Sequence, residues 1–113
     1  MAAIDPTNLI GAITAAVNGA VGKDITTLQG FAKSQVDGLA KQAQLIAGAL
    51  AAGHLTDAQR DFFLSDLKRT AQDFVKVLAG LTALEVEKAW NAAVNALWSA
   101  ISQAAGVALP KPF

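Results

Sequence analysis

One uncharged stretch, residues 89–110, constrains the fold of this chain more than any other feature. Its sequence, AWNAAVNALWSAISQAAGVALP, contains no charged side chain. Drawn as a helix at about 100° per residue, it places Asn91, Asn95, Ser99 and Ser102 in one polar line. The apolar remainder is much wider than the stripe of about 100° that a surface helix usually buries. We therefore expect this helix to be covered on nearly all sides.

The first helical segment, residues 6–21, has the same design. Asp5-Pro6 is typical of a helix start, because Asp caps a helix well and Pro is tolerated at its first position. No residue from 6 to 22 is charged, and all charged residues of the chain except Asp5 and Lys111 lie between residues 23 and 88. The first and last helices therefore form an uncharged pair.

Two amphipathic helices are expected between them, at residues 25–52 and 57–79. Asp24 can cap the first of these, and Gly53 can follow its end. The predicted core face of the second consists of Phe63, Leu67, Ala71, Phe74 and Leu78, whereas Leu45 and Phe62 fall off the core faces. The last helix is expected at residues 83–105, because Thr82 and Glu85 form a capping box. Residues 107–113 should form a short extended tail.

These short connections predict that sequential helices pack antiparallel. The sequence thus predicts a single helical domain over residues 1–113 with an all-α fold. That fold is an antiparallel up-and-down four-helix bundle, or an array of helical hairpins, completed by self-association. In a lone bundle the first and last helices would expose more apolar surface than a monomer normally shows.

We therefore expect a homo-oligomer, such as a ring or a filament, held together by the uncharged helices. The predicted oligomer interface consists of Leu9, Ile13, Val17, Trp90, Asn91, Val94, Asn95, Leu97, Trp98 and Ile101. An asparagine line in such an interface would fix the register between copies. This hypothesis gives the chain a structural role without catalysis.

Two alternatives remain open. The segments Phe-Ala-Lys-Ser-Gln at residues 31–35 and Gln-Asp-Phe-Val-Lys at residues 72–76 resemble phasins, the helical proteins that coat polyester storage granules. This resemblance implies an amphipathic protein at a lipid, membrane or granule surface; a pore-forming protein belongs to the same alternative. A simple spanning helix is disfavoured, because asparagine needs a hydrogen-bonding partner inside lipid. The weaker alternative is a bundle that binds a small apolar ligand in its core.

Composition and single residues exclude several other functions. The chain has nine basic and nine acidic residues and no basic cluster, so we expect no nucleic-acid partner. It has no cysteine and only one histidine, His54, which is expected to lie in a turn as a helix cap or in solvent. We therefore predict no metal site, no cofactor and no catalytic residues.

The other candidate side chains also have structural interpretations. Asp57, Asp61, Asp66 and Asp73 alternate with basic residues, as on a solvated ion-paired helix face. Trp90 and Trp98 could stack a ligand, but packing in a core or interface is the commoner role of such residues. The N-terminal apolar run has no positively charged region before it, so no signal peptide is recognised and a cytoplasmic location is the default expectation.

Overall fold

The computed structural model describes residues 3–113; residues 1 and 2 of the predicted domain lie outside this range. The elements in chain order are α1 (Pro6–Val21), the 3₁₀ helix η1 (Ile25–Thr27), α2 (Lys33–Ala51), α3 (Asp57–Lys76) and α4 (Ala83–Ala105). No strand occurs between residues 3 and 113. The prediction of an all-α four-helix bundle is confirmed, whereas self-association stays a prediction.

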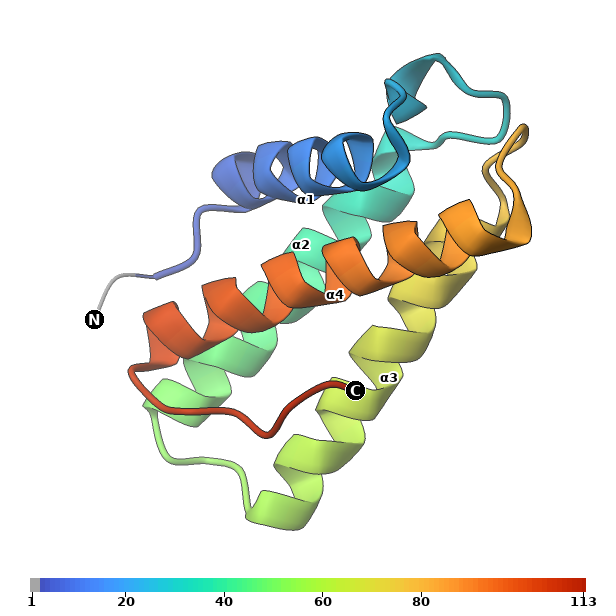
Figure 1. Cartoon of the computed structure of the whole chain (residues 1–113). Helices are drawn as coiled ribbons and strands as arrows, with labels where there is room; N and C mark the ends of the chain where they lie inside the picture. The colour runs from blue at the N-terminus through green and yellow to red at the C-terminus, as the bar shows by residue number, and fades with distance from the viewer. Residues whose placement is uncertain (1–2) are drawn as a thin grey trace.

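The four helices form two layers, and α4 has the most extensive contacts with the other helices. Figure 1 shows α1 and α4 side by side in opposite directions, with α2 and α3 behind them. Helix α4 contacts all three other helices and contacts α1 most extensively, whereas α1 and α3 do not touch. The bundle measures 41 × 25 × 19 Å, so it is flattened along its shortest axis. Helix α2 also contacts the other three helices, but α4 is covered more extensively, and few of its residues from Ala89 onward are exposed, in agreement with its wide apolar arc.

Local capping chemistry sets the ends of the first and last helices. The Asp5 carboxylate accepts a hydrogen bond from the backbone N–H of Thr7 at 3.0 Å, and Gly22 ends α1 in the left-handed conformation. Thr82 and Glu85 form a complete capping box at the start of α4, and Gly106 ends that helix in the same left-handed conformation. The predicted bounds of these two helices, 6–21 and 83–105, therefore agree with the structure.

The predicted helix over residues 25–52 is wrong in its first part. Asp24 caps only the 3₁₀ turn η1, and α2 begins at Lys33. Between them Gly30 has φ +90°, which a right-handed helix cannot contain. This break lets the α1–α2 connection dock on the α3–α4 connection, where the backbone N–H of Ala79 donates to the carbonyl of Gln29 at 2.8 Å.

The predicted third helix, residues 57–79, ends earlier than expected, at Lys76, where the chain turns toward this contact. Its core face is correct at Leu67, Ala71, Phe74 and Leu78 but wrong at Phe63, which is 40% exposed. Leu64 is buried instead, because it faces Trp98 and Pro110 on the α4 side, while Phe63 faces the α2 side.

Acid should weaken the two capping turns at Asp24 and Glu85. Hydrogen bonds from the Thr26 hydroxyl and then from its backbone N–H lower the pKa of Asp24 from its ordinary value of 3.8. The backbone N–H of Thr82 lowers the pKa of Glu85 from 4.5. A carboxylate with a lower pKa in the folded state stabilises the fold above its unfolded pKa, and this contribution disappears as the pH falls through the folded pKa.

We therefore expect the free energy of unfolding to decrease as the pH falls below about 4.5. Urea unfolding followed by circular dichroism across this range measures the effect. Glu85→Gln removes one of the two titrating groups and should flatten the pH dependence. An unchanged pH profile in this variant would show that the Glu85 cap contributes nothing.

Candidate functional site

Most of the predicted oligomer interface lies inside the chain. Leu9, Ile13, Val17, Val94, Leu97, Trp98 and Ile101 are all buried in the core, at 8% exposure or less. The reason is that α1 and α4 of one chain cover each other's bulky apolar faces. Of the remaining three residues, Trp90 and Asn91 are half-buried and Asn95 is exposed. The buried side chains are not accessible to a second copy while the chain keeps this fold.

The outward surface of α1, and that of α4 from Ala89 onward, is uncharged and made mostly of small or polar residues. Gly11, Ala12, Ala15 and Gly19 are exposed on α1, and none of the large exposed hydrophobic side chains of residues 3–113 belongs to that helix. The two serines of the polar line of α4 form hydrogen bonds within the chain: the Ser102 hydroxyl donates to the carbonyl of Val107 at 2.6 Å, and the Ser99 hydroxyl accepts from the Gln103 amide at 3.4 Å. This surface offers little apolar area to a partner.

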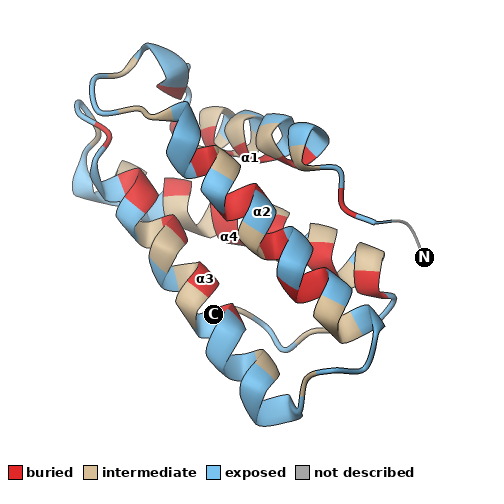
Figure 2. Cartoon of the chain, turned by 180° about the vertical axis from the view of Figure 1, so that it is seen from behind, coloured by how far each residue is buried: buried red, intermediate tan, exposed pale blue. Residues whose placement is uncertain are grey.

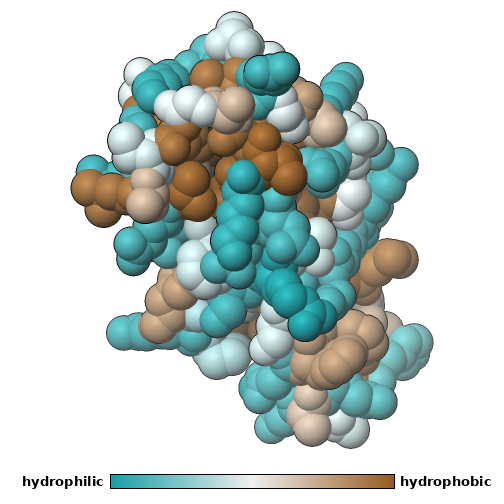
Figure 3. All heavy atoms as spheres, turned by 90° about the vertical axis from the view of Figure 1, so that its right-hand side faces the viewer, coloured by the Kyte–Doolittle hydropathy of each residue, from teal (hydrophilic) through white to brown (hydrophobic). Residues whose placement is uncertain are grey.

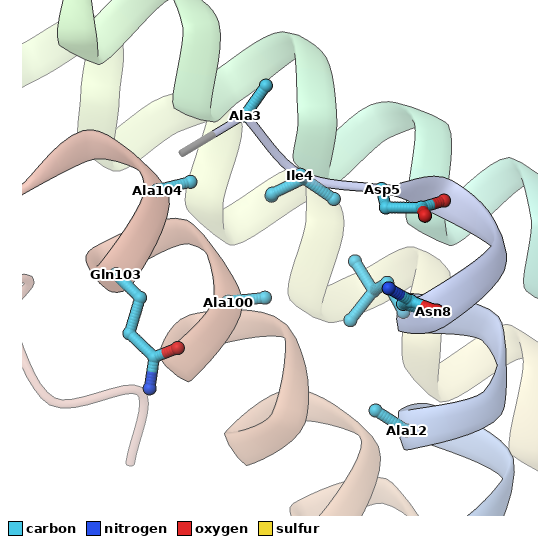
Figure 4. A pocket seen from close by; sticks show the side chains of 9 residues that line it. Ala3, Ile4, Asp5, Asn8, Ala12, Ala100, Gln103 and Ala104 are labelled. Atoms are coloured by element: carbon cyan, nitrogen blue, oxygen red, sulfur yellow. The ribbon is translucent and has the colours of Figure 1, made fainter. Parts of the chain in front are cut away.

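A hollow of about 300 Å³ opens between the ends of α1 and α4. Figure 4 shows it bordered by Ala100, Gln103 and Ala104 of α4, by Asn8 and Ala12 of α1, and by the segment from Ala3 to Asp5. The Asp5 carboxylate is already occupied in capping α1. Four of the nine lining residues are alanine, and no reactive groups are directed at a common point.

One group of large apolar side chains, three of them exposed, lies instead on α2, on α3 and in the turn between them. We call Leu45, Leu55, Phe62 and Phe63 the hairpin patch. Leu45 is 75% exposed, Phe62 is 67% exposed and Phe63 is 40% exposed. The Phe62 and Phe63 rings contact each other edge to face at 5.6 Å. In Figure 2, seen from the α2–α3 side, the helix ends that meet at this hairpin are largely exposed.

A groove of about 350 Å³ runs between α2 and α3 beside these side chains. It is lined by Gln42, Leu45, Ile46, Ala49, Leu55, Phe63 and Asp66. Sequence reasoning placed Leu45 and Phe62 off the core faces but assigned them no role. The signal was the presence of large apolar side chains on the outward faces of otherwise charged helices.

Charges around the hairpin patch are paired within the chain. Lys41 bonds Asp37 at 3.0 Å, Arg60 bonds Asp61 at 2.9 Å, and Arg69 bonds Asp66 at 2.7 Å. The expected ion-paired face is therefore present for Asp57, Asp61 and Asp66, since Arg60 also reaches Asp57 at 3.6 Å. The patch is apolar at its centre, and its edge carries three basic and four acidic side chains that are held in ion pairs.

A second apolar area lies at the opposite end of the bundle. Figure 3 shows hydrophobic residues gathered there, over the α1–α2 and α3–α4 connections. Leu84 is 60% exposed and Val77 is 46% exposed, with Leu28 and Leu81 half-buried. A side chain–backbone bond from Lys23 to the carbonyl of Gly80 at 3.0 Å crosses this area. The α1–α2 and α3–α4 connections themselves cover much of this second apolar area.

The predicted C-terminal tail has neither helix nor strand and lies against α3 and α4. We call residues 107–113 the strap. The indole N–H of Trp98 donates to the carbonyl of Pro110 at 2.9 Å, and Lys68 donates to the carbonyl of Pro112 at 2.7 Å. The Phe113 ring packs edge to face on Trp90 at 4.9 Å. Both tryptophans are thus engaged by the strap.

Two further properties bear on the sequence hypotheses. Within residues 3–113, no three His, Asp or Glu side chains come together as metal ligands would, and His54 lies exposed in the turn, where its backbone N–H caps α2 at the carbonyl of Ala49. None of the helices in the described part of the chain is both long and apolar enough to cross a membrane.

A scan against protein-family models, a comparison with curated proteins and a search of solved structures each gave no match.

Proposed function

We propose that this chain is a non-catalytic helical protein that acts by association, with the hairpin patch as its contact surface and a second copy as its partner. The observation that carries the proposal is the exposure of Leu45, Phe62 and Phe63 beside an apolar groove. Aromatic side chains at the centre of a surface contribute most of the binding energy of typical interfaces. The proposal moves the contact from the uncharged helices to the charged hairpin.

The exposed area indicates a weak and reversible contact. On a scale of about 200 Å² for a large side chain, the three exposed fractions amount to roughly 350 Å². A stable interface of standard size buries about 800 Å² on each partner. The hairpin patch can therefore form the centre of a small interface, with polar residues of α2 and α3 at its rim. We expect a dimer that forms only as the protein concentration rises.

The geometry suits a second copy better than a charged partner. A two-fold contact brings the same surface of both copies together, so it requires a projection and a groove on one surface. The hairpin patch has both: Phe62 projects, and the neighbouring groove is lined by Ile46 and Ala49. The bordering charges are held in ion pairs, so the repulsion between two copies is limited to the one excess acidic charge at Arg60, which Asp57 and Asp61 share.

The lipid- or granule-surface hypothesis uses the same side chains and is the alternative outcome of the experiment. Leu45 and Phe62 could enter an apolar phase, as an interfacial helix does with its apolar face. The groups around them do not favour anionic lipid, since Asp57, Asp61 and Asp66 border the patch without a basic cluster. The bundle that holds an apolar ligand is supported less, because the hollows described above open at the surface.

Phe62→Asp should raise the dissociation constant of the dimer at least about tenfold, because the contact would then bury an unpaired carboxylate. Sedimentation velocity over a series of protein concentrations measures this. Leu84→Asp is the matched control: it adds the same charge at a side chain of similar exposure, 60% against 67%, at the other end of the bundle. The control should leave the dimer unchanged.

Three results would contradict this proposal. An unaltered chain that stays monomeric at millimolar concentration and binds no neutral lipid vesicles has no association function at this patch. A monomer that floats with such vesicles, and loses this property in Phe62→Asp, supports the lipid alternative instead. A dimer that is broken by Leu84→Asp and not by Phe62→Asp would place the contact at the opposite end.

A further inference from the structure

The strap is bound by a groove in which two side chains of α3 and α4 donate hydrogen bonds to its backbone carbonyls. The Trp98 indole and the Lys68 ammonium each donate to a strap carbonyl, at 2.9 Å and 2.7 Å. The Lys68 ammonium also lies 5.3 Å from the centre of the Phe113 ring. The Trp90 indole donates to the backbone carbonyl of Lys68 at 2.9 Å, which fixes the orientation of the ring that Phe113 contacts. The groove is therefore preorganised by α3 and α4.

The composition of the strap matches these donors. Both carbonyls that the groove recognises belong to prolines, Pro110 and Pro112. Proline has no backbone N–H, so such a segment offers acceptors and few donors, and its fixed φ keeps it extended. Aromatic-lined grooves bind proline-containing extended segments in this way in many recognition domains. The side chains of Lys68, Trp90 and Trp98 thus form a site suited to an extended segment that contains proline.

The strap is bound only loosely in this groove. Val107 is 41% exposed and Phe113 is 57% exposed, and no helix or strand continues into residues 107–113. An open hollow of about 150 Å³ remains beside it, lined in part by Leu64, Ser65 and Trp98. A segment with few buried contacts opens at low cost relative to the global fold. Displacement of the strap would leave the bundle core in place and expose both tryptophans.

From this we infer that the α3–α4 groove is a binding site for an extended peptide of the class Pro-x-Pro-aromatic from a partner protein, and that the strap occupies it as an internal competitor. A tethered segment acts at an effective concentration in the millimolar range. A free peptide therefore competes poorly until the strap is loosened. The groove shares no residue with the hairpin patch, so this inference does not rest on the proposed dimer.

The test uses the full chain and a peptide with the sequence of residues 107–113, acetylated and amidated at its ends. The chain has two tryptophans, Trp90 and Trp98, and no tyrosine, and the peptide has neither, so tryptophan fluorescence reports on the groove alone. Leu109 is half-buried against the bundle core, and Phe113 packs on Trp90, so these two side chains are the apolar anchors of the strap. The variant Leu109→Ser/Phe113→Ser removes both and leaves the sequences of α3 and α4 unaltered. This loosened chain should bind the peptide saturably and at least about tenfold more tightly than the unaltered chain does.

Two comparisons make the result specific. A peptide with both prolines replaced by alanine should bind the loosened chain at least several-fold more weakly, since it is less preorganised. Trp98→Phe in the loosened chain should weaken binding several-fold by removing the indole donor. Phe62→Asp should leave the affinity for the peptide unchanged, because Phe62 belongs to the hairpin patch and not to the groove that binds the strap.

The inference is overturned if a loosened chain with a native circular dichroism spectrum shows no saturable binding up to millimolar peptide. It is also overturned if the alanine peptide binds as tightly as the proline peptide. Should the double variant not fold, Phe113→Ser alone is judged by the same criteria, since that side chain is already 57% exposed.

Discussion

Gly30→Ala is expected to lower the free energy of unfolding by about 3–5 kcal/mol, the largest effect of any single methyl group in this chain. Gly30 has φ +90°, and a Cβ added there would overlap the backbone carbonyl oxygen of Val77. Part of the cost is therefore conformational, about 1–2 kcal/mol for an L-residue at positive φ. The rest arises because a backbone carbonyl cannot move aside as a side chain can.

The matched control for this substitution is Gly80→Ala. Gly80 has φ +86°, but no atom lies within 4 Å of the Cβ that alanine would add, so only the conformational cost should remain. Gly48→Ala, inside α2 and also in open space, should stabilise the chain by about 0.5–1 kcal/mol. Urea unfolding of the three variants measures the series. Equal losses for Gly30→Ala and Gly80→Ala would show that the two connections do not pack as closely as described.

The same contact explains what the sequence could not predict about the second helix. Asp24 is a strong local capping signal, and it caps a 3₁₀ turn. The true start of α2 follows Ala32, which makes no side-chain capping bond. That start depends on the distant pairing of Gln29 with Ala79 and on the fit of Gly30 against Val77. A helix that is placed by a contact between two loops leaves no capping pattern in its own sequence.

The first and last helices were predictable because their ends are determined by neighbouring residues. Asp5 with Pro6, and Thr82 with Glu85, act within one turn, and both helices begin where these pairs predict. The wide apolar arc correctly indicated that α4 is covered on many sides, whereas the similar arc of α1 leaves Gly11, Ala12, Ala15 and Gly19 exposed. The sequence pattern of α1 or α4 alone does not show which helices cover it. That depends on how the four helices are arranged, with α4 in contact with all three others.

The candidate sites also combine features that helical periodicity predicts with features that depend on contacts between distant residues. The outward positions of Leu45 and Phe62 follow from helical periodicity and were predicted. The exposure of Phe63 depends on which neighbour lies on each side of α3, and periodicity alone selected the wrong one of two adjacent residues. The strap was predicted as an extended tail, but its contacts with Trp90, Trp98 and Lys68 join residues far apart in the sequence.

Leu97→Ala should lower the free energy of unfolding by about 2–5 kcal/mol, through lost burial and the cavity that remains. Leu97 is fully buried among the helices of one chain. Because this packing is intramolecular, the loss should be the same at every protein concentration, whereas an interface between copies gives a stability that changes with concentration. Thermal and urea unfolding in the Phe62→Asp background, where the proposed dimer is weakened, separates the two contributions.

Asn95→Ala, on the exposed side of the same helix, is the control and should change the free energy of unfolding by less than about 0.5 kcal/mol. The pair of variants decides what the uncharged helices do. If Leu97→Ala leaves a dilute chain as stable as before but dissociates an assembly at high concentration, the bulky face of α4 lies between copies. If the loss is large and independent of concentration, the absence of charge on α1 and on α4 from Ala89 onward is the consequence of their close packing on each other. Association would then use the faces that α2 and α3 leave exposed.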